Sequence, residues 1–354
     1  MRITHIILII IGIGISNDFL AQTPDLMVEM QPTSGKYDSD VLVSLYAPKG
    51  AIYYTLNGNE PTRRSIRYRG PFKIRKTTVV RAAAYRYGQK SQVLSQTYLI
   101  KEPTSSIPIV SLSVPPHQLF NPEYGLFTEG ENITSTHPAK YGANYWSRRK
   151  LTVNVEIFEI NEDKVFNGKT EFRVFGGVSR TFPQKSFSVS LDKNYGVSEF
   201  KYPLFGKSGP KKIKHLVFRN SGSDWGKSHF RDAYITSLTR NLDYESQRYR
   251  PVHIYINGKY WGMYNMREKV NRYFLDTYYD IDRDSIDLLE GRYLIKSGYR
   301  TEYLKLLRYL RNNDLSSEEH YAYIKSKIDV ESFTDFIITQ IFVNNRDAGG
   351  NVKY

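Results

Sequence analysis

The sequence contains no cysteine among its 354 residues. This absence excludes disulfide bonds, thiolate metal ligands and an anchor attached to a lipid-modified cysteine. The 7 histidines show no metal-ligand spacing, which argues against a zinc site. The sequence also has no P-loop, no nucleophile elbow of the Gly-x-Ser-x-Gly type and no evident pair of glycosidase carboxylates. These gaps argue against P-loop nucleotide hydrolysis, serine-hydrolase chemistry and glycoside hydrolysis.

Acidic residues are in the minority, because 36 Asp and Glu stand against 50 Lys and Arg and leave a formal net charge of +14. A basic surface favours partners that carry phosphate, anionic polysaccharide or acidic protein. The positive charge is spread along the chain and forms no single basic tract. We therefore do not expect nucleic acid as a partner.

Long apolar runs are confined to the start of the chain. Arg2 precedes the apolar run Ile6–Ile15, and Ala21 offers a cleavage point, although Phe19 is larger than the residue usual at its position. Residues 1–21 therefore predict an export signal, which is too short for a comfortable membrane span. No other segment approaches spanning length. We expect a soluble mature chain without a membrane span that is secreted, periplasmic or located at the cell surface.

Residues 26–100 predict a small β-sandwich, because short strand-like runs alternate with turn signals. The expected strands are Val41–Tyr46, Ala51–Leu56, Thr78–Tyr85 and Ser95–Ile100. Asn57-Gly58 follows one of these runs and predicts a tight hairpin.

The segments PTSGKYDSDVLVSLYAPKGAIYYTLNGNEPT and TTVVRAAAYRYGQKSQVLSQTYLI resemble the chitobiase/β-hexosaminidase C-terminal domain over nearly the whole unit. The resemblance implies an immunoglobulin-like accessory module and leaves binding to cell-wall or extracellular polysaccharide open. Tyr53, Tyr54 and Tyr85 are candidates for stacking on sugars, but we favour packing in the core for all three.

The rest of the chain mixes strands and helices. The Pro and Ser content of Lys101–Pro108 predicts a linker. Strands are expected at Ile109–Val114, Leu151–Ile160, Leu216–Arg219, Val252–Ile256 and Tyr260–Met266, the last two joined at Asn257-Gly258. Helices are expected near residues 229–241, before Tyr279 and through the last hundred residues. In that last part Ser316 to Glu319 has capping-box spacing, and Phe333, Ile337 and Ile341 predict a buried helix.

The stretch Glu171–Leu191 organises the second half of the chain. Two strand-like segments flank Gly176-Gly177-Val178-Ser179-Arg180, and Lys185 follows. Glycines let backbone approach a ligand closely, and backbone N–H groups together with cations can hold phosphate. The stretch therefore predicts a phosphate-binding loop. The alternative is a glycine hairpin with two solvated basic side chains.

Residues 150–354 resemble the CotH kinase family, the spore-coat-protein-H-like atypical protein kinases. Five blocks carry the resemblance in the family's order: GGVSRTFPQKSF, YGVSEFKYPLF, LVFRNSGSDW with HFRDAYITSL, YRPVHIYINGKYWGMYNMREKVNRYFL, and FIITQIFVNNRDAGGNVKY. The resemblance implies an exported bacterial enzyme that uses ATP and Mg²⁺ to phosphorylate Ser or Thr of a surface or extracytoplasmic protein. The expected architecture is α+β: an immunoglobulin-like β-sandwich at 26–100, a linker at 101–108, and an atypical protein-kinase-like α+β domain at 109–354.

The resemblance also implies roles for single residues. The nucleotide-binding residues would be Gly176, Gly177, Ser179, Arg180 and Lys185, with the glycines and Ser179 as the cover and Lys185 as the main phosphate cation. Glu268 would pair with Lys185 and hold it in place, as the lysine–glutamate pair does in kinases. The alternatives are a solvated Lys185 and a Glu268 that is simply a carboxylate at a helix start.

The polar loop near the end of the chain would be the catalytic loop. Asp347 would serve as base or metal carboxylate and Asn351 as metal ligand; the alternative is an Asp/Gly turn without chemistry. Asn220, Asp224, Arg231 and Asp232 form a polar block that would line the site. Kinases of this kind need a further metal-binding aspartate, and Val352–Tyr354 starts a strand where the chain stops. We therefore expect a C-terminal truncation and an incomplete metal site.

Two other functions stay open at this point. The first is a non-catalytic binding protein at the cell surface, associated with polysaccharide, that uses the kinase-like fold as a scaffold. The second is carbohydrate processing, which ranks last because the sequence lacks paired carboxylates.

Overall fold

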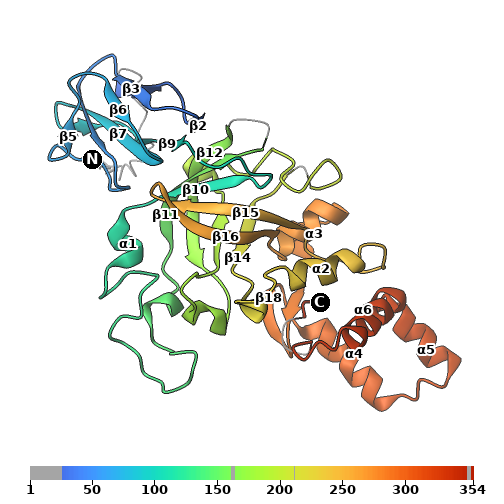
Figure 1. Ribbon diagram of the computed structural model, residues 1–354. Helices are drawn as coiled ribbons and strands as arrows, with labels where there is room; N and C mark the ends of the chain where they lie inside the picture. Colours follow the sequence, from blue (N-terminus) through green and yellow to red (C-terminus); the bar gives the residue numbers. More distant parts are fainter. Residues whose placement is uncertain (1–25, 161–163, 211, 349–351) are drawn as a thin grey trace, which may run out of the picture.

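The computed structural model describes residues 26–160, 164–210, 212–348 and 352–354. The expected export signal at 1–21 and Asn351 lie outside the described residues. Figure 1 shows a strand-rich region near the N-terminus, a second strand-rich region at the centre, and helices on the side of the centre away from the first region.

Two sheets build the N-terminal region, which we call the sandwich. Its strands are β1 (Glu29–Gln31), β2 (Gly35–Tyr37), β3 (Val41–Tyr46), β4 (Ala51–Thr55), β5 (Ile66–Arg67), β6 (Phe72–Ile74), β7 (Thr78–Arg86), β8 (Gln89–Lys90) and β9 (Leu94–Ile100). One sheet has the order β1-β3-β6, and the other the order β2-β9-β7-β4-β5 with β8 paired to β7. Along β3, Val41, Val43 and Leu45 are buried in a core shared by both sheets, as the period of two requires. The expected strands of this region are present.

The hairpin predicted at Asn57-Gly58 is wrong. The chain leaves β4 and runs through residues 56–65 before it pairs again as β5. Gly58 has a positive φ of 85°, and a Cβ there would lie 2.1 Å from Asn257 Oδ1 of the central region. Its carbonyl accepts a hydrogen bond from Arg81 Nη1 at 2.6 Å. The glycine therefore serves a close contact between the two strand-rich regions.

The central region is a closed barrel, which we call the barrel. Its strands are β10 (Ile109–Ser113), β11 (Leu151–Phe158), β12 (Lys164–Val174), β13 (Phe187–Ser190), β14 (His215–Arg219), β15 (Tyr249–Ile256) and β16 (Lys259–Glu268). They pair in the order β10-β11-β12-β13-β14-β16-β15, and β10 closes the ring by pairing with β15 in parallel. Phe172, Phe187 and Phe218 stack across three neighbouring strands, with ring centroids 5.1 and 4.8 Å apart, and all three are fully buried.

The hairpin predicted at Asn257-Gly258 is confirmed. It joins β15 and β16 through these two residues alone, with φ of 52° at Asn257 and 77° at Gly258. Two successive positive φ angles are the geometry of a type I′ turn, which matches the twist of the paired strands. The hairpin matters for the site because β16 pairs directly with β14, the strand that leads into Asn220.

A buried polar contact joins the sandwich to the barrel. The Thr97 hydroxyl of β9 donates to Glu156 Oε2 of β11 at 2.5 Å and lies 2.8 Å from the Ser111 hydroxyl of β10. Asn167 Nδ2 of β12 donates to Glu156 Oε1 at 3.3 Å and to the Ser95 carbonyl at 3.1 Å. An apolar cluster lies at the same junction and consists of Leu99, Ile109, Phe158 and Tyr255. The two units therefore meet through side chains that are shielded from water.

Helices lie between the strands of the barrel in sequence and after its last strand. They are α1 (Pro116–Phe120), α2 (Arg231–Leu238), α3 (Arg272–Tyr279), α4 (Thr301–Asn312), α5 (Glu318–Lys325) and α6 (Val330–Phe342), with a small hairpin of β17 (Leu288–Glu290) and β18 (Leu294–Ser297) before α4. In Figure 1 α4, α5 and α6 lie together away from the sandwich. Among the described residues, no helix combines the length and the apolar character needed to cross a membrane.

The burial predicted for the last helix is wrong. Phe333 and Ile341 of α6 are 57 % and 73 % exposed, and Thr339 is the buried residue of this helix. The apolar period is present, but the side that carries it faces outward. Periodicity therefore identified the helix correctly and misjudged its environment, because burial depends on what packs against a face.

Two local helix predictions also need correction. The residue at the N-terminal cap of α5 is Ser317 and makes no side-chain capping bond, while the Ser316 hydroxyl donates to Asp314 Oδ2 at 2.8 Å. The capping box is lost because this short local bond competes with it. Helix α2 is shorter than expected, and Tyr234 and Leu238 on its apolar stripe are 55 % and 54 % exposed.

Candidate functional site

The glycine turn, residues 176–185, connects β12 to β13. The ladder continues one step past β12, where Phe175 N donates to the Ser186 carbonyl at 2.8 Å. Gly176 then turns the chain with a positive φ of 104°, a conformation that a residue with a Cβ rarely adopts. Residues Val178–Thr181 form a short 3₁₀ helix. The turn therefore has a definite shape that its glycine makes possible.

Asn220, the residue after β14, clamps the glycine turn from one side. Its Nδ2 donates to the Gln184 carbonyl at 2.6 Å and to the Ser179 carbonyl at 3.2 Å. Its Oδ1 accepts from the Ser186 hydroxyl at 2.8 Å, and the Asn220 backbone N–H donates to Ser186 Oγ at 2.9 Å. Asn220 is 1 % exposed. A polar side chain that is satisfied on all sides in the interior holds both ends of the turn in register.

Arg180 crosses the glycine turn and reaches the loop before β11. Its Nε donates to the Gly176 carbonyl at 2.5 Å, and its Nη1 donates to the Tyr145 carbonyl at 2.8 Å. The guanidinium carbon also lies 4.8 Å from the centroid of the Trp146 ring. Burial lowers the pKa of the Arg180 guanidinium, which nevertheless stays charged at any physiological pH.

Lys185 is 4 % exposed, so the interpretation of this residue as a solvated lysine is wrong. Its ammonium donates to the Arg180 carbonyl at 2.9 Å and to the Phe182 carbonyl at 3.0 Å, and lies 4.6 Å from the centroid of the Tyr145 ring. Burial lowers the pKa of Lys185 to about 8. The Tyr264 hydroxyl fixes the Lys185 backbone by donating to its carbonyl at 3.0 Å.

The two cations of the turn share one feature. Within the described part of the chain, neither Arg180 nor Lys185 forms an ion pair with a carboxylate. Carbonyl oxygens and aromatic rings orient both groups without cancelling their charge. The Tyr145 hydroxyl beside them is buried and has no hydrogen-bond partner among the described residues. Such a set of groups has positive charge and donor capacity to spare, which suits an anion.

Glu268 does not hold Lys185 in this structure. Its Oε1 accepts from the Tyr278 hydroxyl at 2.6 Å, and its Oε2 accepts from the Arg248 N–H at 3.0 Å. Burial raises the pKa of the Glu268 carboxyl above its usual value. On β16 it lies opposite Leu216 at the start of β14, whereas Asn220 and the glycine turn lie beyond the other end of that strand. The barrel therefore places Glu268 and Lys185 toward opposite ends of their strands.

The catalytic-loop candidate Asp347 lies in an exposed turn after α6. Its N–H donates to Asn345 Oδ1 at 3.0 Å, and its carboxylate is open to solvent. Its proposed partner Asn351 lies outside the described residues. In the described ranges, no three His, Cys, Asp or Glu side chains gather in a way that could hold a metal ion. Among the described residues, the hydrogen bond of Asp347 to Asn345 does not join it to the glycine turn, so the common cleft for Lys185 and Asp347 stays a prediction.

The polar block after β14 builds a second cluster next to the clamp. Asp224 is 3 % exposed, accepts from the Ser228 hydroxyl and lies 3.2 Å from Arg231 Nη2, and these partners lower the pKa of its carboxyl. Asp232 of α2 lies 3.0 Å from Arg219 and 3.1 Å from Arg267. All four residues expected in this block are therefore near one another in the fold, and three of them form ion pairs.

Sequence reasoning missed two residues of the site. Arg267 of β16 is 1 % exposed and reaches Asp232, and Tyr145 lies beneath Lys185 and supplies a carbonyl to Arg180. The sequence could have indicated Arg267, because it lies between Met266 and Glu268 in an expected strand, and a charged side chain that is buried in a strand needs a partner. Nothing in the segment around Tyr145 indicates that it reaches a loop thirty-five positions later.

Comparison with family models gives two matches. The model described as chitobiase/beta-hexosaminidase C-terminal domain matches residues 32–96, which lie in the sandwich. The model described as CotH kinase protein matches residues 172–354, which is more than half of the 354 residues and includes the glycine turn, the clamp and Asp347. No curated protein matches the chain. The order of the two matched regions agrees with the resemblances found in the sequence, and the chain belongs to the CotH kinase protein family.

Proposed function

We propose that this protein is an exported, Mg²⁺-dependent protein kinase that transfers the γ-phosphate of ATP to Ser or Thr of a surface or extracytoplasmic protein. One observation carries the proposal: a glycine turn positions two cations, the buried Lys185 and the half-buried Arg180, that form no ion pair with a carboxylate among the described residues. Phosphoryl transfer depends mainly on positioning and on neutralising phosphate charge, which is what this arrangement offers.

Different residues of the turn would contact different parts of the nucleotide phosphates. The backbone at Gly176 and Gly177 can approach phosphate oxygens closely, since a Cβ at Gly177 would meet no atom within 4 Å. Lys185 would supply the phosphate-binding charge and Arg180 a second charge. Two of the three N–H donors of the Lys185 ammonium bond to carbonyls, so a bound phosphate would take the third donor or replace one of the carbonyls. It would also raise the pKa of Lys185 by favouring the charged form.

Asp347 would serve as the base or as one metal ligand. Mg²⁺ is commonly held by one or two carboxylates together with waters and substrate phosphates, so an exposed carboxylate fits one position of that shell. When bound, the ion would neutralise charge on the transferring phosphate. Asp347 in either role requires its carboxylate to lie close to the phosphate held at the glycine turn.

A second candidate function is a non-catalytic binding protein on the same scaffold. The observation that favours it is the shielding of Lys185, whose ammonium is already satisfied by two carbonyls and a ring. This candidate predicts no nucleotide binding at all. Carbohydrate processing, the third interpretation, would be revived by glycan binding that persists when residues 150–354 are deleted.

Nucleotide binding separates the first two candidates. We expect ATP with Mg²⁺ to raise the melting temperature of the protein, and Lys185→Met to abolish that rise. Lys201→Met is the matched control, because Lys201 is an exposed lysine outside the turn. Phosphate incorporation from labelled ATP into a bacterial surface-protein extract should disappear with Asp347→Ala. An unchanged melting temperature together with no incorporation would favour the scaffold.

The cellular location of the protein is tested separately. We propose that residues 1–21 direct export, and fractionation of bacterial cells expressing the full chain should then recover a shortened protein outside the cytoplasm. Recovery of the uncut chain in the cytoplasm would contradict this part of the proposal and leave the phosphotransfer part untouched.

A further inference from the structure

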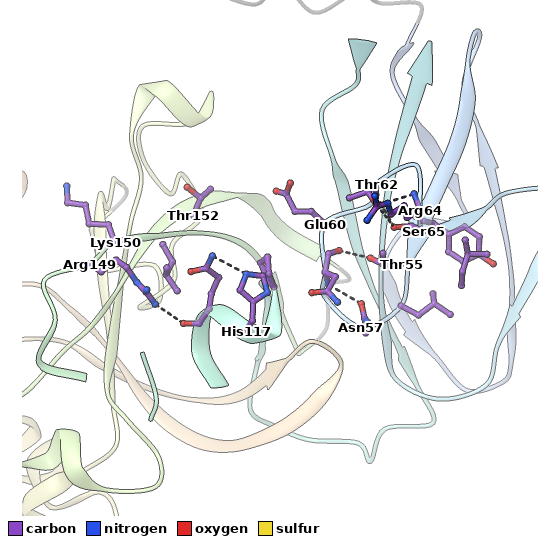
Figure 2. Close-up of a pocket in the computed structure, with 17 residues that line it drawn as sticks. Thr55, Asn57, Glu60, Thr62, Arg64, Ser65, His117, Arg149, Lys150 and Thr152 are labelled. Atoms are coloured by element: carbon purple, nitrogen blue, oxygen red, sulfur yellow. Dashed lines mark hydrogen bonds between the residues drawn. The ribbon is translucent and has the colours of Figure 1, made fainter. Parts of the chain in front are cut away.

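We propose that the cleft between the sandwich and the barrel is a docking groove for an extended acidic segment of a protein that also carries aliphatic side chains. The cleft has a volume of about 1060 Å³. Figure 2 shows its two walls, with residues 55–65 of the sandwich on one side and the region of α1 and the start of β11 on the other. A volume at the upper end of the range for ligand sites has room for several residues of a chain.

Positive charge dominates the walls. The lining contains the cations Arg64, Arg149 and Lys150 and a single carboxylate, Glu60. Lys150 is paired with Glu171 outside the groove at 2.7 Å, so Arg64 and Arg149 supply the uncompensated positive charge. Glu60 is already paired with Lys90 at 3.2 Å and lies 3.8 Å from Arg81. Its charge is therefore compensated from outside the groove, and the groove itself attracts anions.

Hydrogen bonds orient the Arg149 guanidinium without neutralising its charge. Its Nη2 donates to the Tyr124 carbonyl at 2.8 Å and to the Gln118 carbonyl at 3.1 Å, and its Nε is buried without a hydrogen-bond partner among the described residues. Carbonyl oxygens orient the guanidinium but leave its charge available to a carboxylate. Opposite it, Arg64 is exposed and forms no ion pair within the described part of the chain.

The apolar part of the lining decides between a peptide and an acidic polysaccharide. Ile66 and Leu56 lie in the sandwich wall and are 54 % and 38 % exposed, so aliphatic surface is open in the groove. The aromatic residue of the lining, Tyr54, is only 8 % exposed and stacks on Phe72, so its ring is not a platform for a sugar. Exposed aliphatic side chains between cations fit a peptide in which acidic and aliphatic residues alternate.

This groove is separate from the glycine turn, whose residues are not in its lining. The idea that the docked segment belongs to the phosphoacceptor protein rests on the proposed kinase function. The binding of the segment to the groove does not rest on that function, because it requires neither nucleotide nor Asp347. Docking at a distance would raise the local concentration of the acceptor at the turn.

The test measures fluorescence anisotropy of a labelled acidic peptide of about a dozen residues, in which Glu and Asp alternate with Leu and Ile, added to the full chain without nucleotide at about 0.15 M ionic strength, where charges outside the groove are screened. We expect Arg64→Glu to raise the Kd about tenfold and Ile66→Ser to raise it severalfold. Arg67→Glu is the matched control, because Arg67 is an exposed arginine three residues from Arg64 that lies next to Ile66 on β5 but outside the groove. Its Kd should stay within about twofold of the wild type.

The outcomes are distinct. A loss in Arg64→Glu and Arg149→Gln, with Arg67→Glu unaffected, supports the groove. Equal losses in Arg64→Glu and Arg67→Glu would mean that overall charge attracts the peptide, and would overturn the assignment. Absence of peptide binding would overturn it as well, and so would oligogalacturonate binding that depends on Arg64 while the peptide does not bind. Because nucleotide is absent, a failed kinase assay leaves each of these results unchanged.

Discussion

Replacing Glu156 by glutamine tests the polar contact between the sandwich and the barrel. Glu156 is fully buried, and burial raises the pKa of its carboxyl from 4.5 to about 7. Hydrogen bonds from Thr97 and Ser34 and the charge of Lys164 act in the opposite direction but do not offset the loss of hydration. The interface therefore favours the protonated acid, which glutamine resembles in size and in charge.

The sign and size of the effect follow from linkage. Below pH 4.5 the carboxyl is protonated in both the folded and the unfolded chain, so its ionisation costs nothing. Between pH 4.5 and about 7 the folded state loses stability, because the unfolded chain ionises this carboxyl while the folded chain keeps it protonated, and the loss is complete once the pH has passed through about 7. Between pH 5 and pH 8 the wild type should lose about 2–3 kcal/mol of unfolding free energy from this group alone. Glu156→Gln should be free of that loss.

The assay is urea denaturation of wild type, Glu156→Gln and Glu131→Gln at pH 5 and pH 8, followed by intrinsic fluorescence. Glu131 is an exposed glutamate and serves as the matched control. Other titrating groups contribute equally to all three proteins, so the comparison isolates Glu156. If Glu156→Gln shows the same dependence on pH as the wild type, the carboxyl is ionised at neutral pH and the reasoning about burial is refuted.

Four further outcomes are expected. Asn220→Ala removes the clamp of the glycine turn and leaves the partners of a buried amide unsatisfied, so it should lower the unfolding free energy by about 2–3 kcal/mol in urea denaturation. Replacing the half-buried Asn313 at the end of α4 by alanine should cost less, because its side chain makes a single hydrogen bond, to the Tyr309 carbonyl. Phe187→Ala opens a cavity among stacked rings of the barrel and should cost about 3–5 kcal/mol, measured in the same way; a cost below about 1 kcal/mol would contradict the barrel core. Burial lowers the pKa of the His215 imidazole from 6.5 to about 3. The stability that neutral His215 contributes is therefore present above pH 6.5 and is lost as the pH falls, because the unfolded chain then binds a proton that the folded chain does not. His215→Phe should remove about 2 kcal/mol of the destabilisation seen at pH 5. The rate at which a small amine-reactive electrophile labels Lys185, measured against pH, should show a pKa near 8 without ligand and a higher pKa with ATP and Mg²⁺. A pKa that ATP leaves unchanged would count against phosphate binding at the turn.

Local signals in the sequence predicted local structure well. Asn257-Gly258 specifies a two-residue turn through the φ angles it allows, and the alternation in Val41–Tyr46 specifies a strand with one buried face. The same dipeptide at Asn57-Gly58 predicted a hairpin that does not form, because its glycine is used for a contact with Asn257 far along the chain. Turn propensity is local, and it yields when a distant part of the molecule needs the same residue.

The site was predictable in its composition and only partly in its geometry. Gly176, Arg180 and Lys185 are found together because ten residues between two paired strands have little freedom to separate. The partners of these residues were not predictable: Asn220 and Tyr145 reach the turn through barrel pairing and through a long loop. Glu268 was assigned to Lys185 by resemblance alone, and strand register places it elsewhere.

The parallel pairing of β10 with β15 has a consequence for how the chain acquires its structure. Ile109 and Val110 find their partners His253 and Ile254 only after the intervening barrel strands have been made. A chain that emerges from its N-terminus therefore presents β10 with one neighbour missing for most of its synthesis, and contacts of this range form slowly. The open edge of β10 is the place where a nascent or partly folded chain would be most exposed to mispairing, and where a chaperone would have the most to shield.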